Sequence, residues 1–140
     1  MSEIDALLHD LLASTGASRV TLREDRPDDV FPVTHEALAD DAAPITGVAT
    51  PDMARQPVVL QVQQGRQVVQ DDCLAASDEP HFRTMLELYG GLRAQIVTPV
   101  MRGGKVVAIV SLHQLGWARQ WTEDEVGTAR ATAERVGELL

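Results

Sequence analysis

Polar side chains that can bind an anion fall on stretches whose residues alternate as in β-strands. Residues 18–24 place Thr21 and Arg23 on one face of such a stretch, and Ser111 and His113 share a face of another. A guanidinium is the side chain best shaped to bind a carboxylate or a phosphate. A cavity that combines arginine, histidine and hydroxyl groups therefore suits a small organic anion.

Arg93 and His35 are further candidates for the same cavity. Arg93 opens a strand expected to pair with the strand of His113, and His35 lies in the strand expected after residue 30. We therefore expect ligand-binding side chains at Arg23, Arg93, Ser111, His113 and His35. The alternative is that the arginines lie at a rim or in solvent, paired with the abundant carboxylates.

The single cysteine, Cys73, excludes an intramolecular disulfide, and this cysteine usage fits a reducing cytosol. Histidines and cysteines are not spaced as in a local metal motif, so no metal ligand is expected. We interpret Cys73 as a half-buried side chain that behaves as a small hydrophobic group. A competing hypothesis is a small enzyme that uses His113, His35 or Cys73.

The first half of the chain is expected to supply a helix, a hairpin and a variable middle. The expected elements are a helix over 3–14, strands over 18–24 and 31–38, a helix over 58–64 and a strand over 67–70. Ser2 is the expected N-cap of the first helix, and Gly16 is its expected stop. Strand 18–24 alternates as a half-buried strand does. Residues 39–56 are expected to form a long loop with one helical turn, and such loops are usually functional or mobile.

The second half is expected to end in a hairpin and a long helix. The expected elements are a helix that starts at Pro80 and stops at Gly90, strands over 93–101 and 105–115, and a helix over 123–140. Thr122 and Glu125 form a capping box at the start of the last helix. The strand over 105–115 is apolar on both faces, which is typical of a central strand.

Length and charge narrow the classes of partner. A chain of 140 residues with 44% hydrophobic residues suits one domain over 1–140. The net charge of −9 argues against nucleic acid and against an anionic membrane surface as partners. The N-terminus lacks the basic start and apolar run of a signal peptide, so a cytoplasmic location is expected.

Three segments in the last fifty residues resemble the end of a GAF domain: Ala94-Gln95-Ile96-Val97-Thr98-Pro99-Val100, Gly104-Lys105-Val106-Val107-Ala108-Ile109-Val110-Ser111-Leu112 and Trp121-Thr122-Glu123-Asp124-Glu125. Ala108 stands where the family usually has glycine, and Trp121 stands where it usually has phenylalanine. The N-terminal helix and the Gly65–Val69 step also fit the family.

The resemblance implies an α/β (α+β) fold. It has a GAF-like central antiparallel sheet, N- and C-terminal helices packed on one face and a ligand cavity on the other. Members of the family bind cyclic nucleotides, tetrapyrroles, haem, amino acids or other small metabolites, and many dimerise. Fold alone does not fix the ligand.

We therefore expect a stand-alone small-molecule-binding sensor domain without cofactor or metal, whose ligand is a small organic anion and whose output passes through a partner. A homodimer through the terminal helices is expected, because isologous dimers are the commonest oligomers. Two alternatives stay open. One is the small enzyme named above, and the other is a ligand-free dimerisation or interaction module.

Overall fold

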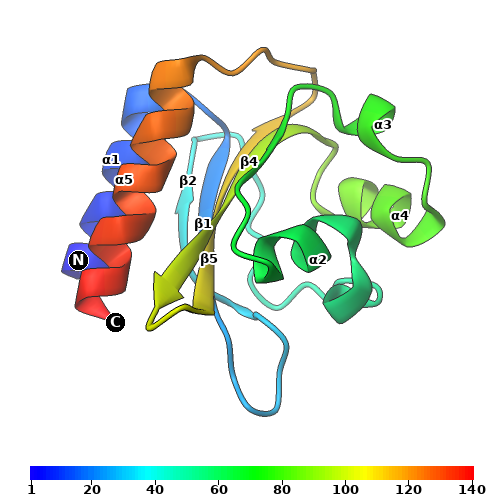
Figure 1. Ribbon diagram of the computed structural model, residues 1–140. Coiled ribbons are helices and arrows are strands. Elements are labelled where there is room, and N and C mark those ends of the chain that lie inside the picture. Colours follow the sequence, from blue (N-terminus) through cyan, green and yellow to red (C-terminus); the bar gives the residue numbers. More distant parts are fainter.

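Five strands form one antiparallel sheet in the order β2-β1-β5-β4-β3. The computed structural model describes all residues, 1–140 (Figure 1). The strands are β1 (Arg19–Glu24), β2 (Val33–Leu38), β3 (Val68–Gln70), β4 (Leu92–Arg102) and β5 (Lys105–Leu115). The helices are α1 (Glu3–Thr15), η1 (Met53–Arg55), α2 (Pro57–Gln63), α3 (Cys73–Ala76), α4 (Pro80–Leu88) and α5 (Glu123–Leu139). The expected α+β architecture is confirmed.

The terminal helices α1 and α5 lie side by side on one face of the sheet (Figure 1). Ser2 and Asp5 form a capping box at the start of α1, and Thr122 and Glu125 form the same motif at the start of α5. Each box satisfies backbone N–H groups that the first helical turn leaves free. Gly16 ends α1 with a φ of 64°, a left-handed conformation that glycine adopts without steric cost. The predicted caps are thus present.

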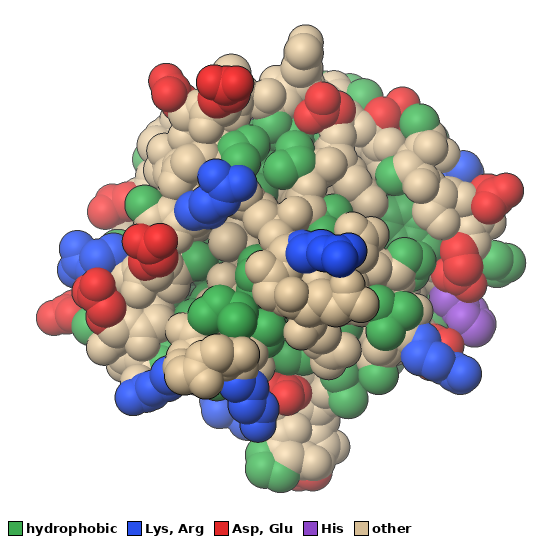
Figure 2. All heavy atoms as spheres, in the orientation of Figure 1, with side chains coloured by type: hydrophobic (Ala, Val, Ile, Leu, Met, Phe, Trp, Pro, Cys, Tyr) green, Lys and Arg blue, Asp and Glu red, His purple; other side chains and the backbone are tan.

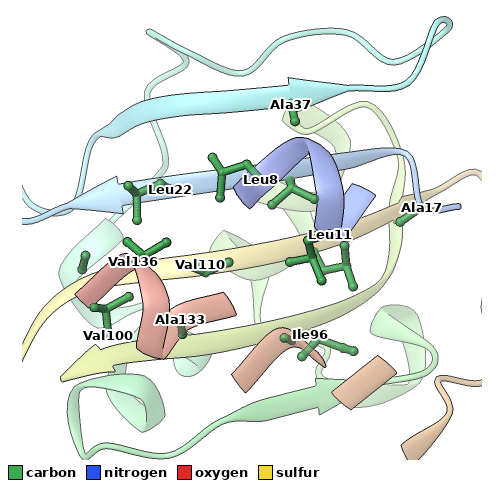
Figure 3. Close-up of a cluster of buried hydrophobic side chains, with 14 of the residues drawn as sticks. Leu8, Leu11, Ala17, Leu22, Ala37, Ile96, Val100, Val110, Ala133 and Val136 are labelled. Carbon is green, nitrogen blue, oxygen red and sulfur yellow. The ribbon is translucent and has the colours of Figure 1, made fainter. Parts of the chain in front are cut away.

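The space between these two helices and the sheet holds a core of 16 buried residues. Figure 3 shows Leu8 and Leu11 of α1, and Ala133 and Val136 of α5, directed at side chains of the strands below. Small residues at 129 and 133 let α5 approach the sheet closely.

The opposite face of the sheet is covered by η1, α2, α3 and α4 (Figure 1). A second cluster of 15 buried hydrophobic residues fills this layer. The long segment over 39–56 contains one short helical turn, η1, as its sequence indicates. Helix α3 was not expected from the sequence. Its four residues follow Asp72, and the Asp72 side chain caps the helix by accepting a hydrogen bond from the backbone N–H of Leu74.

Strand β1 is buried on both faces, which corrects the expectation of a half-buried strand. It lies in the interior of the sheet between β2 and β5. Val20 and Leu22 face the terminal helices, as members of the first core. The expected polar face of Thr21 and Arg23, to which Arg19 also belongs, lies beneath the other layer, because the chain between β2 and β4 folds over it. The alternation of residues in β1 correctly indicated which side chains share a face of the sheet. It did not indicate that both faces are covered.

The surface carries acidic and basic groups interspersed, as Figure 2 shows for one side. None of the helices combines the length and the apolar character needed to span a bilayer.

Candidate ligand-binding site

A small cavity lies between the sheet and the layer formed by η1, α2 and α4. Its volume is about 40 Å³. It is lined by Arg23, Met53, Gln56, Val58, Val59, Met85, Tyr89, Gln95, Val97, Ile109, Ser111 and His113. Strands β1, β4 and β5 supply the floor. The predicted location, on the sheet face opposite the terminal helices, agrees with this cavity.

The register of the central strands aligns the polar residues in rows. Pairing of β1 with β5 sets Arg19 opposite His113 and Thr21 opposite Ser111. Pairing of β4 with β5 sets Gln95 on the other side of His113. Directly opposed side chains on one face of an antiparallel pair are close neighbours. Residues far apart in sequence therefore meet because of this register.

Arg19 is fully buried and binds only acceptors of the chain itself. Its Nε donates to Nδ1 of His113 at 3.0 Å. Its two Nη atoms donate at 2.8 Å, one to the carbonyl of Ala43 and the other to the carbonyl of Tyr89. These three bonds hold together β1, β5, the loop after β2 and the end of α4. Arg19 therefore holds the elements around the cavity together without lining the cavity itself.

Arg23 lies at the cavity wall and is bonded to Tyr89. One Nη donates to the carbonyl of Phe31 at 2.9 Å, and the other donates to the Tyr89 hydroxyl at 2.6 Å. The Tyr89 hydroxyl also bonds to the hydroxyl of Thr50. The guanidinium carbons of Arg19 and Arg23 lie 5.9 and 5.6 Å from the centre of the Tyr89 ring, which favours both cations.

Neither of these buried guanidinium groups has a carboxylate partner. None of the ion pairs within 4 Å in the chain involves Arg19 or Arg23. Burial lowers the pKa of Arg19 to about 10, and the charge of Glu36 only partly opposes this shift. At neutral pH Arg19 stays cationic. Buried charges usually occur paired, so the local excess of positive charge requires an explanation.

His113 is held neutral with its proton on Nε2. Burial lowers its pKa well below the ordinary value, and the charges of Arg19 and Arg23 lower it further. Arginine can only donate, so Nδ1 of His113 must accept from Arg19. The remaining proton is then on Nε2, which makes no bond within the chain. His113 thus offers a hydrogen-bond donor to the cavity that it lines.

Gln56 supplies an acceptor without a partner. Its Nε2 donates to the carbonyls of Pro51 and His81, at 2.6 and 3.2 Å, which fixes the orientation of the amide. The residue is 1% exposed, lines the cavity, and has no partner for its Oε1. Thr21, buried on the same face of β1 as the two arginines, also has an unpartnered hydroxyl. Unsatisfied buried polar atoms are rare in folded proteins.

Three of the five predicted binding residues, Arg23, Ser111 and His113, line the cavity. Arg93 does not, because the register of β4 shifts between Leu92 and Ala94, and its side chain lies 3.5 Å from a carboxylate oxygen of Asp72. The imidazole of His35 lies outside the cavity, 3.7 Å from a carboxylate oxygen of Glu24.

Cys73 lies outside the cavity lining, in the second apolar cluster. It is fully rather than half buried, and burial raises the pKa of its thiol to about 12. A thiol in this state is not a nucleophile at neutral pH. Neither Cys73 nor His35 joins His113 at the cavity, and the structure contains no cluster of three His, Cys, Asp or Glu side chains arranged to hold a metal.

Sequence reasoning missed Arg19, Gln56, Tyr89 and Gln95 as parts of the site. Arg19 shares the alternation of Arg23, so the pattern of β1 contained a signal for it. Gln56 comes from a loop, where no periodicity marks which residues face inward. Tyr89 continues the helical spacing of Phe82 and Met85, which indicates an inward-facing side chain but not its place at the cavity. Their contribution depends on how the 39–91 segment folds over the sheet.

A larger surface cleft adjoins the cavity at Arg23 and Met53, which line both. Its volume is about 620 Å³. The loop between β1 and β2 and the segment over 45–54 form its walls, and Figure 1 shows both beneath the sheet and α2. Arg23 and Met53 therefore lie between the cavity and this cleft.

The fold is that of an α+β domain whose five-stranded antiparallel sheet lies between two layers of helices. The profile of the GAF domain family matches residues 2–140, so the chain belongs to the GAF family. A comparison with curated proteins gave no match.

Solved structures with the same fold include cyanobacteriochrome domains. The GAF domain of cyanobacteriochrome TePixJ has a TM-score of 0.82 at 22% identity, covering 97% of this chain and 84% of the other. GAF3 of Slr1393 from Synechocystis sp. PCC6803, in its photoproduct state, has a TM-score of 0.74 at 19% identity, covering 97% and 92%. The far-red absorbing dark state of JSC1_58120g3 with bound biliverdin IXα has a TM-score of 0.81 at 19% identity, covering 99% and 89%. At these identities the likeness concerns the fold.

Proposed function

We propose that this GAF domain is a sensor whose cavity binds a small organic anion. The observation that carries the proposal is the pair of buried guanidinium groups, Arg19 and Arg23, with no carboxylate within 4 Å. An anionic group at the cavity would supply the missing negative charge. It would also accept from Arg23, Ser111 and the Nε2–H of His113.

Energetics favour an anion over a neutral ligand. Burying an unpaired charge is unfavourable, and a charge-assisted hydrogen bond is about twice as strong as a neutral one. The cavity contains no acidic side chain that would repel the ligand. Its remaining walls are mostly aliphatic, so the ligand combines one anionic group with a small apolar part.

Biliverdin, which one structural neighbour holds, does not fit the cavity of this chain. The cavity volume of about 40 Å³ is far below the roughly 300–1,000 Å³ typical of pockets for drug-sized ligands. Tyr89 and His113 are its only lining residues with an aromatic ring. Cys73, the only thiol available for covalent attachment, lies elsewhere with its pKa raised by burial. These observations support a small metabolite instead of a tetrapyrrole.

A thermal-shift screen of small carboxylates and nucleotides tests this proposal. A ligand at a hundredfold excess over its Kd adds about 2.7 kcal/mol to the free energy of unfolding, which the screen detects. Arg23→Ala should weaken binding of the anion by about 2–5 kcal/mol, because it removes a buried charged partner.

Arg93→Ala is the matched control, because it removes the same charge from a position outside the cavity. Its response to the anion should equal that of the wild type. The proposal fails if no anion stabilises the wild-type protein, or if Arg23→Ala responds to every anion as the wild type does.

We also propose that the domain forms a homodimer through α1 and α5. The two helices lie next to each other, and apolar side chains that remain partly exposed continue their stripes: Ile4, Leu7, Leu12, Val126 and Leu140. A second copy placed on this face by a twofold axis would cover them.

A further inference from the structure

We infer that the ligand is a small aliphatic hydroxy acid, whose carboxylate is bound by Arg23, Ser111 and His113 and whose hydroxyl donates to Oε1 of Gln56. The inference rests on the proposed function and narrows it. It adds Gln56 as the residue that selects among small acids.

The cavity lining calls for a ligand that carries a hydrogen-bond donor in addition to an anionic group. Gln56 is 1% exposed, and both hydrogens of its Nε2 point at carbonyls, of Pro51 and His81. Turning the amide over would set an oxygen against two carbonyl oxygens, so Oε1 remains the free atom. A buried acceptor that lacks a donor is unfavourable, because it has lost its hydrogen bond to water without gaining another. A ligand that carries a donor removes this penalty.

The donor is a hydroxyl rather than an ammonium group. None of the twelve lining residues is acidic, Arg23 is the charged residue among them, and Arg19 is bonded to the lining residue His113. A buried ammonium needs a carboxylate partner, and beside two guanidinium groups it would be repelled. A neutral hydroxyl binds the amide oxygen of Gln56 without adding charge.

Size and shape restrict the rest of the ligand. A volume of about 40 Å³ corresponds to a few water-sized spheres, which restricts the ligand to the smallest hydroxy acids, of about two to three carbons. The nonpolar wall is made of Val58, Val59, Met85, Val97 and Ile109. The ligand is thus a short aliphatic chain with its two polar groups at one end.

Three acids of equal chain length separate these features: propionate, lactate and alanine. Their affinities for the protein are measured by calorimetric titration at pH 7. We expect lactate to bind about tenfold more tightly than propionate, since a hydrogen bond to a buried acceptor contributes roughly that factor. Alanine should bind more weakly than propionate, because it adds an ammonium group that the guanidinium groups of Arg19 and Arg23 repel.

Gln56→Leu removes the acceptor, so it should reduce the ratio of lactate to propionate affinity to about one. A ratio within one protein is insensitive to an overall loss of stability. Gln67→Leu is the matched control. Gln67 also has a buried Oε1 without a partner, while its Nε2 donates to Thr98 and Val126 outside the cavity. This variant should keep the wild-type ratio.

The possible outcomes separate the two proposals. Three results would overturn the hydroxy acid while leaving an anion site in place. They are equal binding of propionate and lactate, tighter binding of alanine than of propionate, and a ratio of lactate to propionate affinity that does not change in Gln56→Leu. The same holds if other anions bind and all three acids fail. If no anion binds at all, both the proposed function and this inference are wrong.

Discussion

Acidification is expected to destabilise the folded protein through His113. In an unfolded chain the pKa of histidine is about 6.5. In the folded protein, burial and the charges of Arg19 and Arg23 hold the pKa of His113 well below that value. Below pH 6.5 the unfolded state therefore binds a proton that the folded state does not bind, and stability falls as the pH falls.

The size of the effect follows from this difference of one proton. The free energy of unfolding changes by about 1.4 kcal/mol per pH unit while only the unfolded state is protonated. Protonation of the unfolded histidine sets the upper limit of the loss, which is about 2 kcal/mol between pH 7.5 and 5.0. Small domains are stable by about 5–15 kcal/mol, so the loss is measurable while most of the protein stays folded.

Urea denaturation at intervals between pH 7.5 and 5.0 measures this slope. The control is His113→Asn, whose amide oxygen can accept from Arg19 but does not titrate. The difference between wild type and variant isolates His113 from the other histidines and from the carboxylates. If both proteins lose stability in parallel as the pH falls, His113 is not held neutral by its surroundings and the reasoning is refuted.

Two other predictions concern Arg19 and assembly. Arg19→Met removes a positive charge and the donor to Nδ1, so the pKa of His113 should rise, and an NMR titration of the imidazole would record this. An unchanged pKa would mean that Arg19 does not set the state of the ring. For the homodimer, light scattering at micromolar concentration should give twice the chain mass of 15.2 kDa, and the mass of one chain would contradict it.

The terminal elements could be predicted from sequence because local chemistry defines them. The capping boxes at Ser2 and Thr122 and the glycine turn between β4 and β5 each depend on residues within a few positions. The faces of β1 also followed from alternation. Local patterns could therefore locate Arg23, Ser111 and His113 on the correct side of the sheet.

The remaining parts of the site depend on tertiary packing. Arg93 was expected to follow the alternation of β4, but a register shift at the start of that strand breaks the pattern. Tyr89 and Gln56 reach the cavity because α4 and the loop before α2 fold across β1 and β5. No periodic pattern encodes this arrangement, so a single sequence does not reveal it.

The difference between the two arginines of β1 explains how the chain keeps a cationic cavity folded. Arg19 has a carbonyl or imidazole acceptor from the chain for Nε and for each Nη, so its burial does not depend on a ligand. Arg23 has protein acceptors for its two Nη atoms only, and it lies where the cavity meets the outer cleft. A guanidinium has five N–H donors, so Arg23 keeps donors available for a ligand. The same residue type therefore holds neighbouring elements together at position 19, and we propose that it binds the ligand at position 23.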